Sequence, residues 1–367
     1  MVKKILFLSI ISLTLAAKNP DKINLTFLNP SHVDSDFWNT VTSFMKSASK
    51  DLGINIRVHY ASTDRRHMEN YFDLKKDIAA NKIPDYLVMA YIRGGASEKI
   101  IKMALEANIK VFIFNTDVPD EDRKKIGKPR GKFSNWIGHM FPDDEKAGYD
   151  LAEILIKKAR KGAANGKIEV VGISGDRLST AAHLRNKGLR SAVRNNKQEL
   201  RQVIYADWEK VNATKKTQVL IKRYPKVQVF WSASDFMSLG IVEGIKNSGK
   251  IPGKQILTGG VDWMPDALNA IRDGKMTASI GGHFMEGGWV MVMLYDYHNG
   301  KDFAESEGIR TESKMGIIHQ DNISDYLKYF KDSNWDKIDF KKFSKVLNPN
   351  IKKYDFSLDT ILNQLNQ

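Results

Sequence analysis

The stretch INLTFLNPSHVDSDFWNTVTSFMKSASKDL, residues 23–52, decides the fold of this chain. Its first part, Ile23–Leu28, is a strand-like run, and a polar turn holding Ser35-Asp36-Phe37-Trp38 follows. Apolar residues then return at helical spacing at Val41, Phe44, Met45, Ala48 and Leu52. A strand, a turn and an amphipathic helix in this order begin an α/β fold. The turn lies past the carboxyl end of the strand, where open α/β sheets bind ligands.

The same alternation of strand and helix continues to about residue 298. The expected strands are 23–28, 54–60, 85–90, 110–115, 167–174, 201–205, 226–232, 255–261 and 276–281. Single strands separated by single helices form parallel sheets with right-handed crossovers. One sheet of nine or more strands would be large. We therefore expect an α/β fold with two Rossmann-like, doubly wound lobes, whose boundary lies in the Pro- and Gly-containing stretch 119–142.

The first residues resemble an export signal. Lys3 and Lys4 form a basic segment, Ile5–Leu15 is a short apolar run, and Ala16-Ala17 offers small residues for cleavage. A buried first strand or helix is the alternative. We expect a signal peptide over residues 1–17, cleaved near Ala16 or Ala17, and a periplasmic protein.

Composition excludes several classes of function. The chain of 367 residues has no cysteine, which excludes disulfides, thiolate metal sites, a cysteine nucleophile and a lipid-anchored N-terminus. Its formal charge is +14, but the lysines are dispersed and no dense basic run interleaved with aromatics appears. Nucleic acid is therefore not expected as a partner.

No motif indicates catalysis. Gly244–Ile251 (GIKNSGKI) nearly matches a phosphate-binding loop, but Ile251 replaces the required hydroxyl and the stretch ends a helix. Gly172–Asp176 (GISGD) departs from a nucleophile elbow because Asp176 stands where that turn needs glycine. The eight histidines show no metal-ligand spacing. We expect no enzyme activity, no cofactor and no metal site.

Candidate ligand residues lie at strand ends or in the turns that follow. They are Phe37, Trp38, Asn115, Arg185, Trp208, Ser234, Asp235, Asp262 and Trp263. Aromatic planes stack on the C–H faces of a sugar, and its hydroxyls need donors and acceptors together. Each residue also has an ordinary interpretation, as core packing, a turn former, a surface charge or a helix cap. Their common placement favours a sugar site.

The order of six motifs gives the chain a resemblance to a known family. They are Ser35-Asp36-Phe37-Trp38, Asn115-Thr116, Thr180-Ala181-Ala182-His183-Leu184-Arg185, Ala206-Asp207-Trp208, Ser234-Asp235 before Met237-Ser238-Leu239-Gly240, and Gly260-Val261-Asp262. Over about residues 22–300 the chain resembles the type I periplasmic binding proteins, near their ribose/galactose-binding and LuxP autoinducer-2 receptor branches. Gly281-Gly282-His283 departs from the pattern, because sugar binders usually present glutamine there and LuxP-type receptors arginine.

The resemblance implies two lobes joined by a three-crossover hinge. The expected N-terminal lobe is 20–138 plus 284–312, the C-terminal lobe is 139–283 plus 313–345, and 346–367 form an extension. Phe37, Trp38 and Trp208 would stack on the ligand. Hydrogen bonds would come from Ser35, Asn115, Arg185, Ser234 and Asp262, with Asp235, Trp263 and His283 as further candidates.

The resemblance also implies a function. A monomeric periplasmic protein would capture a monosaccharide or similar polyol between its lobes and deliver it to an ABC importer. The alternative is a LuxP-like receptor that signals through a membrane histidine kinase or a chemoreceptor.

Overall fold

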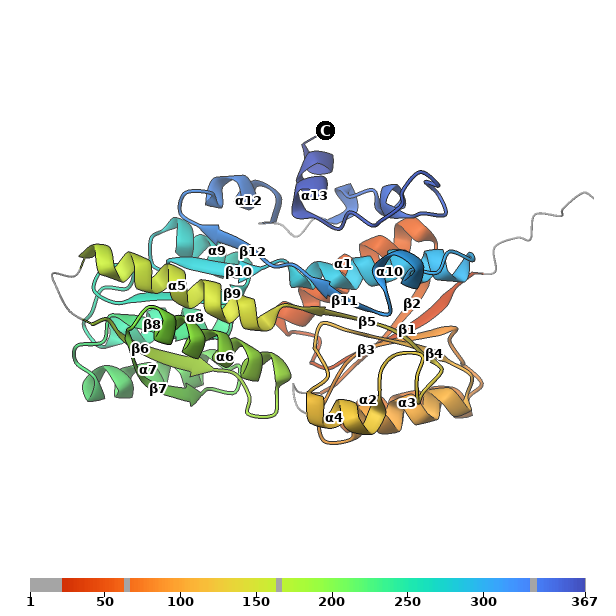
Figure 1. Ribbon diagram of the computed structural model, residues 1–367, viewed down its shortest axis with the longest axis horizontal. Helices are drawn as coiled ribbons and strands as arrows, with labels where there is room; N and C mark the ends of the chain where they lie inside the picture. Colours follow the sequence, from red (N-terminus) through yellow and green to blue (C-terminus); the bar gives the residue numbers. More distant parts are fainter. Residues whose placement is uncertain (1–21, 63–66, 163–166, 331–334, 367) are drawn as a thin grey trace, which may run out of the picture.

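Two six-stranded sheets form two lobes that lie side by side (Figure 1). The computed structural model describes residues 22–62, 67–162, 167–330 and 335–366. Its first sheet has the order β11-β5-β4-β3-β1-β2 and its second the order β12-β10-β9-β8-β6-β7. The expectation of two doubly wound α/β lobes is confirmed.

The strands of the first sheet are all parallel to their neighbours. They are β1 (Asn24–Asn29), β2 (Asn55–Tyr60), β3 (Tyr86–Ala90), β4 (Lys110–Phe114), β5 (Trp136–Pro142) and β11 (Arg310–Ser313). The second sheet comprises β6 (Glu169–Ser174), β7 (Glu199–Tyr205), β8 (Val229–Ser232), β9 (Leu257–Asp262), β10 (Ala278–Gly281) and β12 (Gly316–His319). In that sheet β12 is antiparallel to β10 and the other pairs are parallel.

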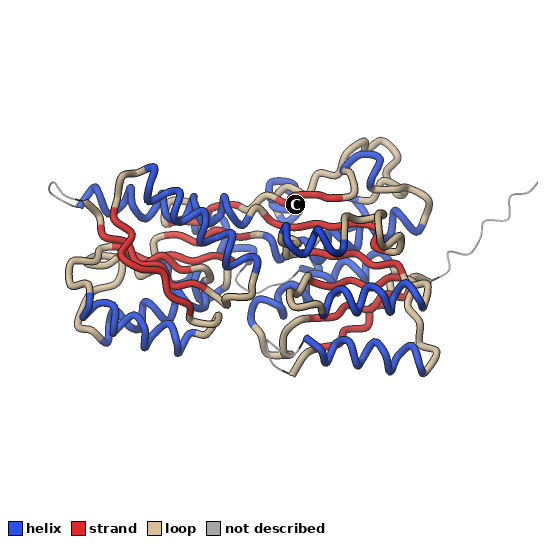
Figure 2. Tube along the Cα trace, turned by 60° about the horizontal axis from the view of Figure 1, so that its bottom comes forward, coloured by secondary structure: helices blue, strands red, loops and turns tan. Residues whose placement is uncertain are grey.

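Helices cover both faces of each sheet, as Figure 2 shows. Those of the first lobe are α1 (Asp36–Leu52), α2 (His67–Ala79), α3 (Ala96–Glu106), α4 (Asp120–Ile126), α10 (Glu286–His298) and α11 (Ala304–Glu307). Those of the second are α5 (Asp144–Gly162), α6 (Thr180–Asn195), α7 (Lys210–Arg223), α8 (Asp235–Asn247) and α9 (Pro265–Arg272). Among the described residues no helix is long and apolar enough to cross a bilayer.

The opening stretch folds as its pattern predicts. The five apolar residues of the α1 stripe are all buried. Helix α1 ends at Gly53, whose φ of 68° is the left-handed conformation that glycine adopts most easily. On β1, Leu25 and Phe27 face α1 and α10, whereas Leu28 faces α2 and α3. A parallel strand covered on both faces must be apolar almost throughout, which explains the run Leu25–Leu28.

Three crossovers join the lobes, between β5 and α5, between β10 and α10, and between β11 and β12. The expected boundary after residue 138 falls inside β5, all of which belongs to the first sheet. The stretch 119–142, taken as a loop-rich boundary, therefore contains a strand. Gly138 and His139 interrupt the apolar pattern of this strand, which is why it was missed.

Glu286 links the crossovers. It begins α10 just after the second crossover, and its carboxylate accepts a hydrogen bond from the Ser313 hydroxyl at the third. Its other oxygen lies 3.5 Å from the Asn115 amide nitrogen. Burial raises the pKa of Glu286 from 4.5 to about 8, and the hydrogen bond from Ser313 offsets only part of this effect.

The C-terminal segment crosses from one lobe to the other. After β12, helix α12 (Ile323–Phe330) packs on α9 and β12 of the second lobe. The 3₁₀-helices at Trp335–Lys337 and Phe340–Phe343 then pack against α1 of the first lobe, and α13 (Leu358–Leu365) follows. The expected assignment of 313–345 to the second lobe is therefore wrong for 335–345, whose partners are α1 and α10.

Asp296 on α10 anchors this segment. Its carboxylate accepts hydrogen bonds from the Ser344 hydroxyl, from the backbone N–H groups of Lys345 (2.7 Å) and Val346 (3.2 Å), and from the Tyr354 hydroxyl (2.9 Å). The carboxylate is fully buried. One side chain thus satisfies four donors of a segment about 50 residues away in sequence.

Asp296→Asn tests this anchor. In the amide an NH₂ group replaces one of the two acceptor oxygens, and it would face N–H and O–H donors. Hydrogen bonds to charged groups contribute about 1.5–3 kcal/mol each. We expect the free energy of unfolding to fall by about 2–4 kcal/mol in urea titrations. Asp321→Asn, at a side chain that is 94% exposed, should change it by less than about 0.5 kcal/mol. Equal effects of the two substitutions would contradict the anchor.

Glu286→Gln tests the pH dependence of the crossovers. Because Glu286 holds its proton more tightly in the folded chain, stability should fall as pH rises from about 4.5 to about 8. Glutamine keeps the shape without the charge, so we expect a higher melting temperature at pH 8 and a flatter profile below it.

The readout is the difference between the profiles of variant and parent, measured by differential scanning fluorimetry from pH 5 to 8. Glu145→Gln, at a partly exposed glutamate of α5, is the control and should leave the profile unchanged. Parallel profiles for Glu286→Gln and its parent would refute the assignment.

Candidate ligand-binding site

The candidate site is built where strands of both sheets end. Asn115 follows β4, Trp208 follows β7, Ser234 follows β8, Asp262 ends β9 and His283 follows β10. Asn115, Trp208 and Asp262 have positive φ angles of 64°, 65° and 134°. Residues other than glycine rarely adopt such angles, and they concentrate at functional sites where surrounding contacts hold them.

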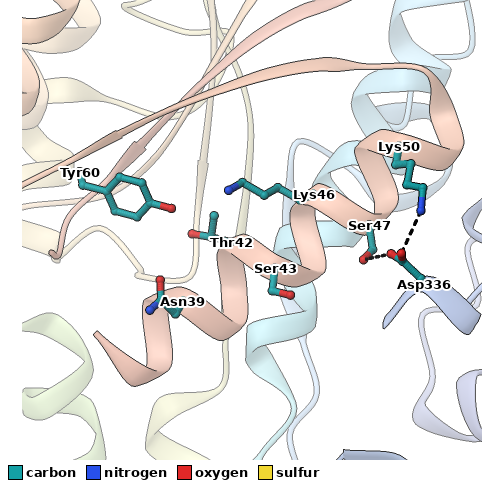
Figure 3. Close-up of a pocket in the computed structure, with 8 residues that line it drawn as sticks. All are labelled: Asn39, Thr42, Ser43, Lys46, Ser47, Lys50, Tyr60 and Asp336. Carbon is teal, nitrogen blue, oxygen red and sulfur yellow. Dashed lines mark hydrogen bonds and ion pairs between the residues drawn. The ribbon is translucent and has the colours of Figure 1, made fainter. Parts of the chain in front are cut away.

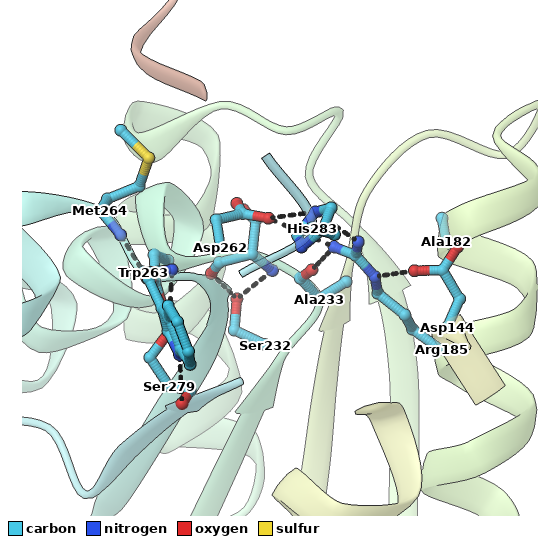
Figure 4. A network of polar contacts seen from close by, with 12 residues as sticks. Asp144, Ala182, Arg185, Ser232, Ala233, Asp262, Trp263, Met264, Ser279 and His283 are labelled. Atoms are coloured by element: carbon cyan, nitrogen blue, oxygen red, sulfur yellow. Dashed lines mark hydrogen bonds and ion pairs between the residues drawn. The ribbon is translucent and has the colours of Figure 1, made fainter. Parts of the chain in front are cut away.

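Arg185 is at the centre of the site. The side chain comes from α6, is 4% exposed, and its Nε donates to Asp144 Oδ1 at 2.7 Å. Nη1 donates to the carbonyl oxygen of Ala233 at 2.8 Å and lies 3.6 Å from Asp262 Oδ1. Figure 4 shows the guanidinium between Asp144 and His283. Burial alone would lower the pKa of Arg185, but Asp144 and Asp262 raise it, so the side chain stays charged.

His283 connects the second crossover to both lobes. Its Nε2 lies 3.4 Å from Arg185 Nη2 and 3.5 Å from Asp262 Oδ1. Its ring stacks on Phe37 of the first lobe, with centroids 4.8 Å apart and planes inclined by 29°. The Asn115 amide donates to its carbonyl oxygen at 3.1 Å. Burial and the charge of Arg185 lower the pKa of His283 well below its usual value, so the imidazole is neutral.

The site is rich in buried carboxyl groups. Burial raises the pKa of Asp262 well above its usual value and that of Asp235 to about 7. Burial also raises the pKa of Asp144, despite its contact with Arg185. Among the described residues, Asp144 Oδ2 and His283 Nδ1 are buried polar atoms with no hydrogen-bond partner. Such atoms need an explanation in a folded protein.

Aromatic rings lie beside this polar cluster. Phe37 and Trp38 are half-buried, and the Trp38 ring packs against Phe27 and Phe114 with centroids 6.3 Å away. Trp208, also half-buried, lies with its ring centroid 6.0 Å from the Arg185 guanidinium carbon. These three rings thus keep part of their surface free, as a stacking role needs.

Three of the predicted site residues make contacts that stabilise the second lobe itself. Trp263 is 4% exposed and packs against Tyr326 of α12, with ring centroids 5.3 Å apart. The Asp235 carboxylate accepts from the Ser279 hydroxyl and is fully buried. The Ser234 hydroxyl accepts from Met237 N at 3.2 Å and caps α8. Trp263 therefore faces the core, whereas Ser234 still has its own hydroxyl proton to donate.

Ser35 precedes α1 at its N-cap position, where its side chain makes no capping hydrogen bond. It is half-buried, two residues before Phe37. The next residue, Asp36, has a pKa that burial and the charge of Asp266 on α9 raise, whereas Lys210 on α7 lowers it. The start of α1 thus faces α7 and α9 across the interlobe region.

Sequence reasoning missed Asp144 and Glu286. Asp144 begins α5, directly after the first crossover, and Glu286 begins α10 after the second. A carboxylate at the start of a helix is ordinarily explained by the helix dipole, so neither residue drew attention. What distinguishes the two residues is that each directly follows a crossover, and the positions of the crossovers could not be read from the sequence alone.

A separate pocket lies along α1, between this helix, the end of β2 and the C-terminal segment (Figure 3). It has a volume of about 480 Å³ and none of the predicted site residues lines it. Its walls are Asn39, Thr42, Ser43, Lys46, Ser47 and Lys50 of α1, with Tyr60 and Asp336.

Comparisons with known proteins agree with this architecture. The model of the periplasmic binding protein domain family matches residues 25–302. A solved periplasmic sugar-binding protein from Pseudomonas fluorescens is 32% identical, with a TM-score of 0.83 over 92% of this chain and 99% of that one. The D-allose-binding periplasmic protein of Escherichia coli (strain K12) is 24% identical over 251 residues, 68% of this chain and 76% of that protein.

The ribose import binding protein RbsB of Escherichia coli (strain K12) is 29% identical over 180 residues, 49% of this chain and 54% of that protein. The family model covers most of the chain, and both lobes are present. The chain therefore belongs to the periplasmic binding protein family.

Proposed function

We propose that this protein captures a monosaccharide or a similar polyol between its lobes and delivers it to an ABC importer. One observation carries the proposal: Arg185, Asp262 and His283 form a buried polar cluster that touches Phe37 of the other lobe. Relatives that bind ribose and D-allose support it.

The cluster offers both kinds of contact that a sugar needs. Phe37, Trp38 and Trp208 supply ring faces for the C–H groups of a pyranose or furanose. Asp262, Asn115 and Arg185 supply acceptors and donors, and hydrogen bonds that involve a charged group are the stronger ones.

Ser35, Ser234 and the unpartnered Nδ1 of His283 would complete the set of hydrogen-bonding groups. We do not assign Trp263 a ligand contact, because its ring is packed in the core. Asp235 would act by holding the backbone beside Asp262.

The partner follows from the same proposal. Binding would close the lobes about the crossovers, and the closed form of the monomer would dock on an ABC permease. Export through the signal peptide at residues 1–17 would place it in the periplasm; these residues lie outside the described part of the chain. A membrane histidine kinase or chemoreceptor stays the alternative, and it rests on the LuxP-like residues Ser35–Trp38 and Asn115.

Isothermal titration calorimetry with D-ribose, D-allose, D-galactose and L-arabinose tests the proposal. We expect saturable one-to-one binding of at least one sugar. Trp208→Leu should raise the Kd of that sugar at least tenfold, because the C–H face of the sugar can no longer stack on the indole plane. Circular dichroism would check that the variant keeps its fold.

Phe72→Leu is the matched control. It removes an aromatic ring that is 51% exposed on α2, away from the site, and should leave the Kd within twofold. No saturable binding in the sugar panel or in a wider polyol panel would refute the proposal, and so would equal effects of the two substitutions.

A further inference from the structure

Trp263 sits in an unusual backbone position directly after the candidate ligand contact Asp262. The φ angles of the two residues are 134° and 64°, and neither is glycine. Two consecutive residues of this kind persist only where the surrounding structure holds them. The contacts of Trp263 therefore decide where the Asp262 carboxylate points.

Hydrogen bonds fix Trp263 to the neighbouring strand, as Figure 4 shows. Its backbone N–H donates to Ser279 Oγ at 3.3 Å and its indole Nε1 donates to Ser279 O at 3.2 Å. Ser279 Oγ in turn donates to Asp235 Oδ2 at 2.8 Å, and Met264 N donates to the same oxygen at 3.0 Å. The turn after β9 is thus tied to β10, the strand that leads into the second crossover.

The indole is also enclosed by glycines at the strand ends where two crossovers attach. A Cβ atom on Gly281 would lie 2.6 Å from the indole, one on Gly282 3.2 Å and one on Gly316 2.7 Å. Gly281 ends β10 and pairs with Gly316, the first residue of β12, while Gly282 is the first residue of the second crossover. The ring therefore fits between these two connections only because they carry no side chain there.

The C-terminal segment closes the remaining side. The rings of Tyr326 and Phe330 on α12 lie 5.3 and 6.0 Å from the Trp263 ring, both nearly edge-on. Phe330 also contacts Phe284, which follows His283 in the second crossover, at 6.2 Å. The ring thus lies between α12 and the ends of β10 and β12, where the two crossovers attach.

We propose that Trp263 is a positioning residue that couples the Asp262 carboxylate to the interlobe crossovers. The second and third crossovers attach at Gly281–Gly282 and Gly316, so a rotation of the lobes would strain these strand ends against a rigid ring, and the ring would move the backbone of Asp262. Because coupling between two events is reciprocal, a ligand held by Asp262 favours one arrangement of the crossovers. The inference rests on the proposed function, in that Asp262 is taken as a ligand contact.

Gly316→Ala tests the coupling without touching the ligand. The φ of Gly316 is compatible with alanine, so the new methyl group acts by pressing on the six-membered ring of the indole. We expect the Kd of the tightest-binding sugar of the panel to rise about tenfold. In Gly316→Ala/Trp263→Phe the smaller ring makes room, and the Kd should return to within threefold of that of Trp263→Phe alone.

A second readout needs no sugar. In the ligand-free protein, Gly316→Ala should speed hydrogen–deuterium exchange several-fold at the amides of Trp263 and Met264, and the double variant should restore the slow exchange. If exchange responds but no sugar binds, the coupling stands and the sugar proposal falls.

Gly172→Ala is the matched control, because its Cβ crowds Leu189 at 2.8 Å in the core of the same lobe. It should lower the melting temperature and leave both the Kd and the exchange at Trp263 unchanged. The proposal is overturned if Gly316→Ala leaves exchange and Kd as in the parent, if Trp263→Phe gives no rescue, or if Gly172→Ala has the same effect on either readout.

Discussion

The buried contact between Arg185 and Asp144 is the interaction on which the interlobe region depends. A guanidinium that is 4% exposed is tolerated only with close partners, because a buried charge without them is costly. Asp144 brings the first crossover to it, Ala233 the turn after β8, and His283 the second crossover. Satisfying one cation therefore fixes three segments that are distant in sequence, and the position of Phe37 follows from its stacking on His283.

The local elements could be predicted from the sequence because their causes are local. The apolar stripe of α1 and the apolar run of β1 reflect burial on known faces, and both appear as expected. The placement of polar and aromatic residues near strand ends also predicted that Arg185 and Asp262 would lie together, and they are 3.6 Å apart, because parallel strands bring their carboxyl ends to one edge. His283 was named only through the family resemblance.

What could not be predicted depends on pairings between distant segments. The ring of Trp263 has an unremarkable place in the sequence, next to an aspartate, and its burial depends on Gly316 and Tyr326, more than 50 residues later. The C-terminal segment has a polar composition, yet it packs closely on α10. Asp296 of α10 accepts four hydrogen bonds from it, and the ring of Trp289 stacks on Phe356 with centroids 4.7 Å apart. Neither partner shows a local pattern that could have identified the other.

The balance of charge in the site bears on the kind of ligand it suits. Within 4 Å of Asp144 and Asp262, the only permanent cation among the described residues is Arg185, and both carboxyl groups share it. Asp235 and Glu286 add further buried carboxyl groups nearby, while His283 is neutral. Burial raises the pKa of Asp235, Asp262 and Glu286, which keeps their negative charge low, and Arg185 is already engaged by Asp144 and Asp262. An anionic ligand would therefore find no spare cation among the described residues and would raise these pKa values further. Hydroxyl groups donate hydrogen bonds to carboxyl oxygens and accept them from protonated carboxyl groups, in both cases without adding charge, and this makes a neutral polyol a better match to the site than a sugar acid or a sugar phosphate.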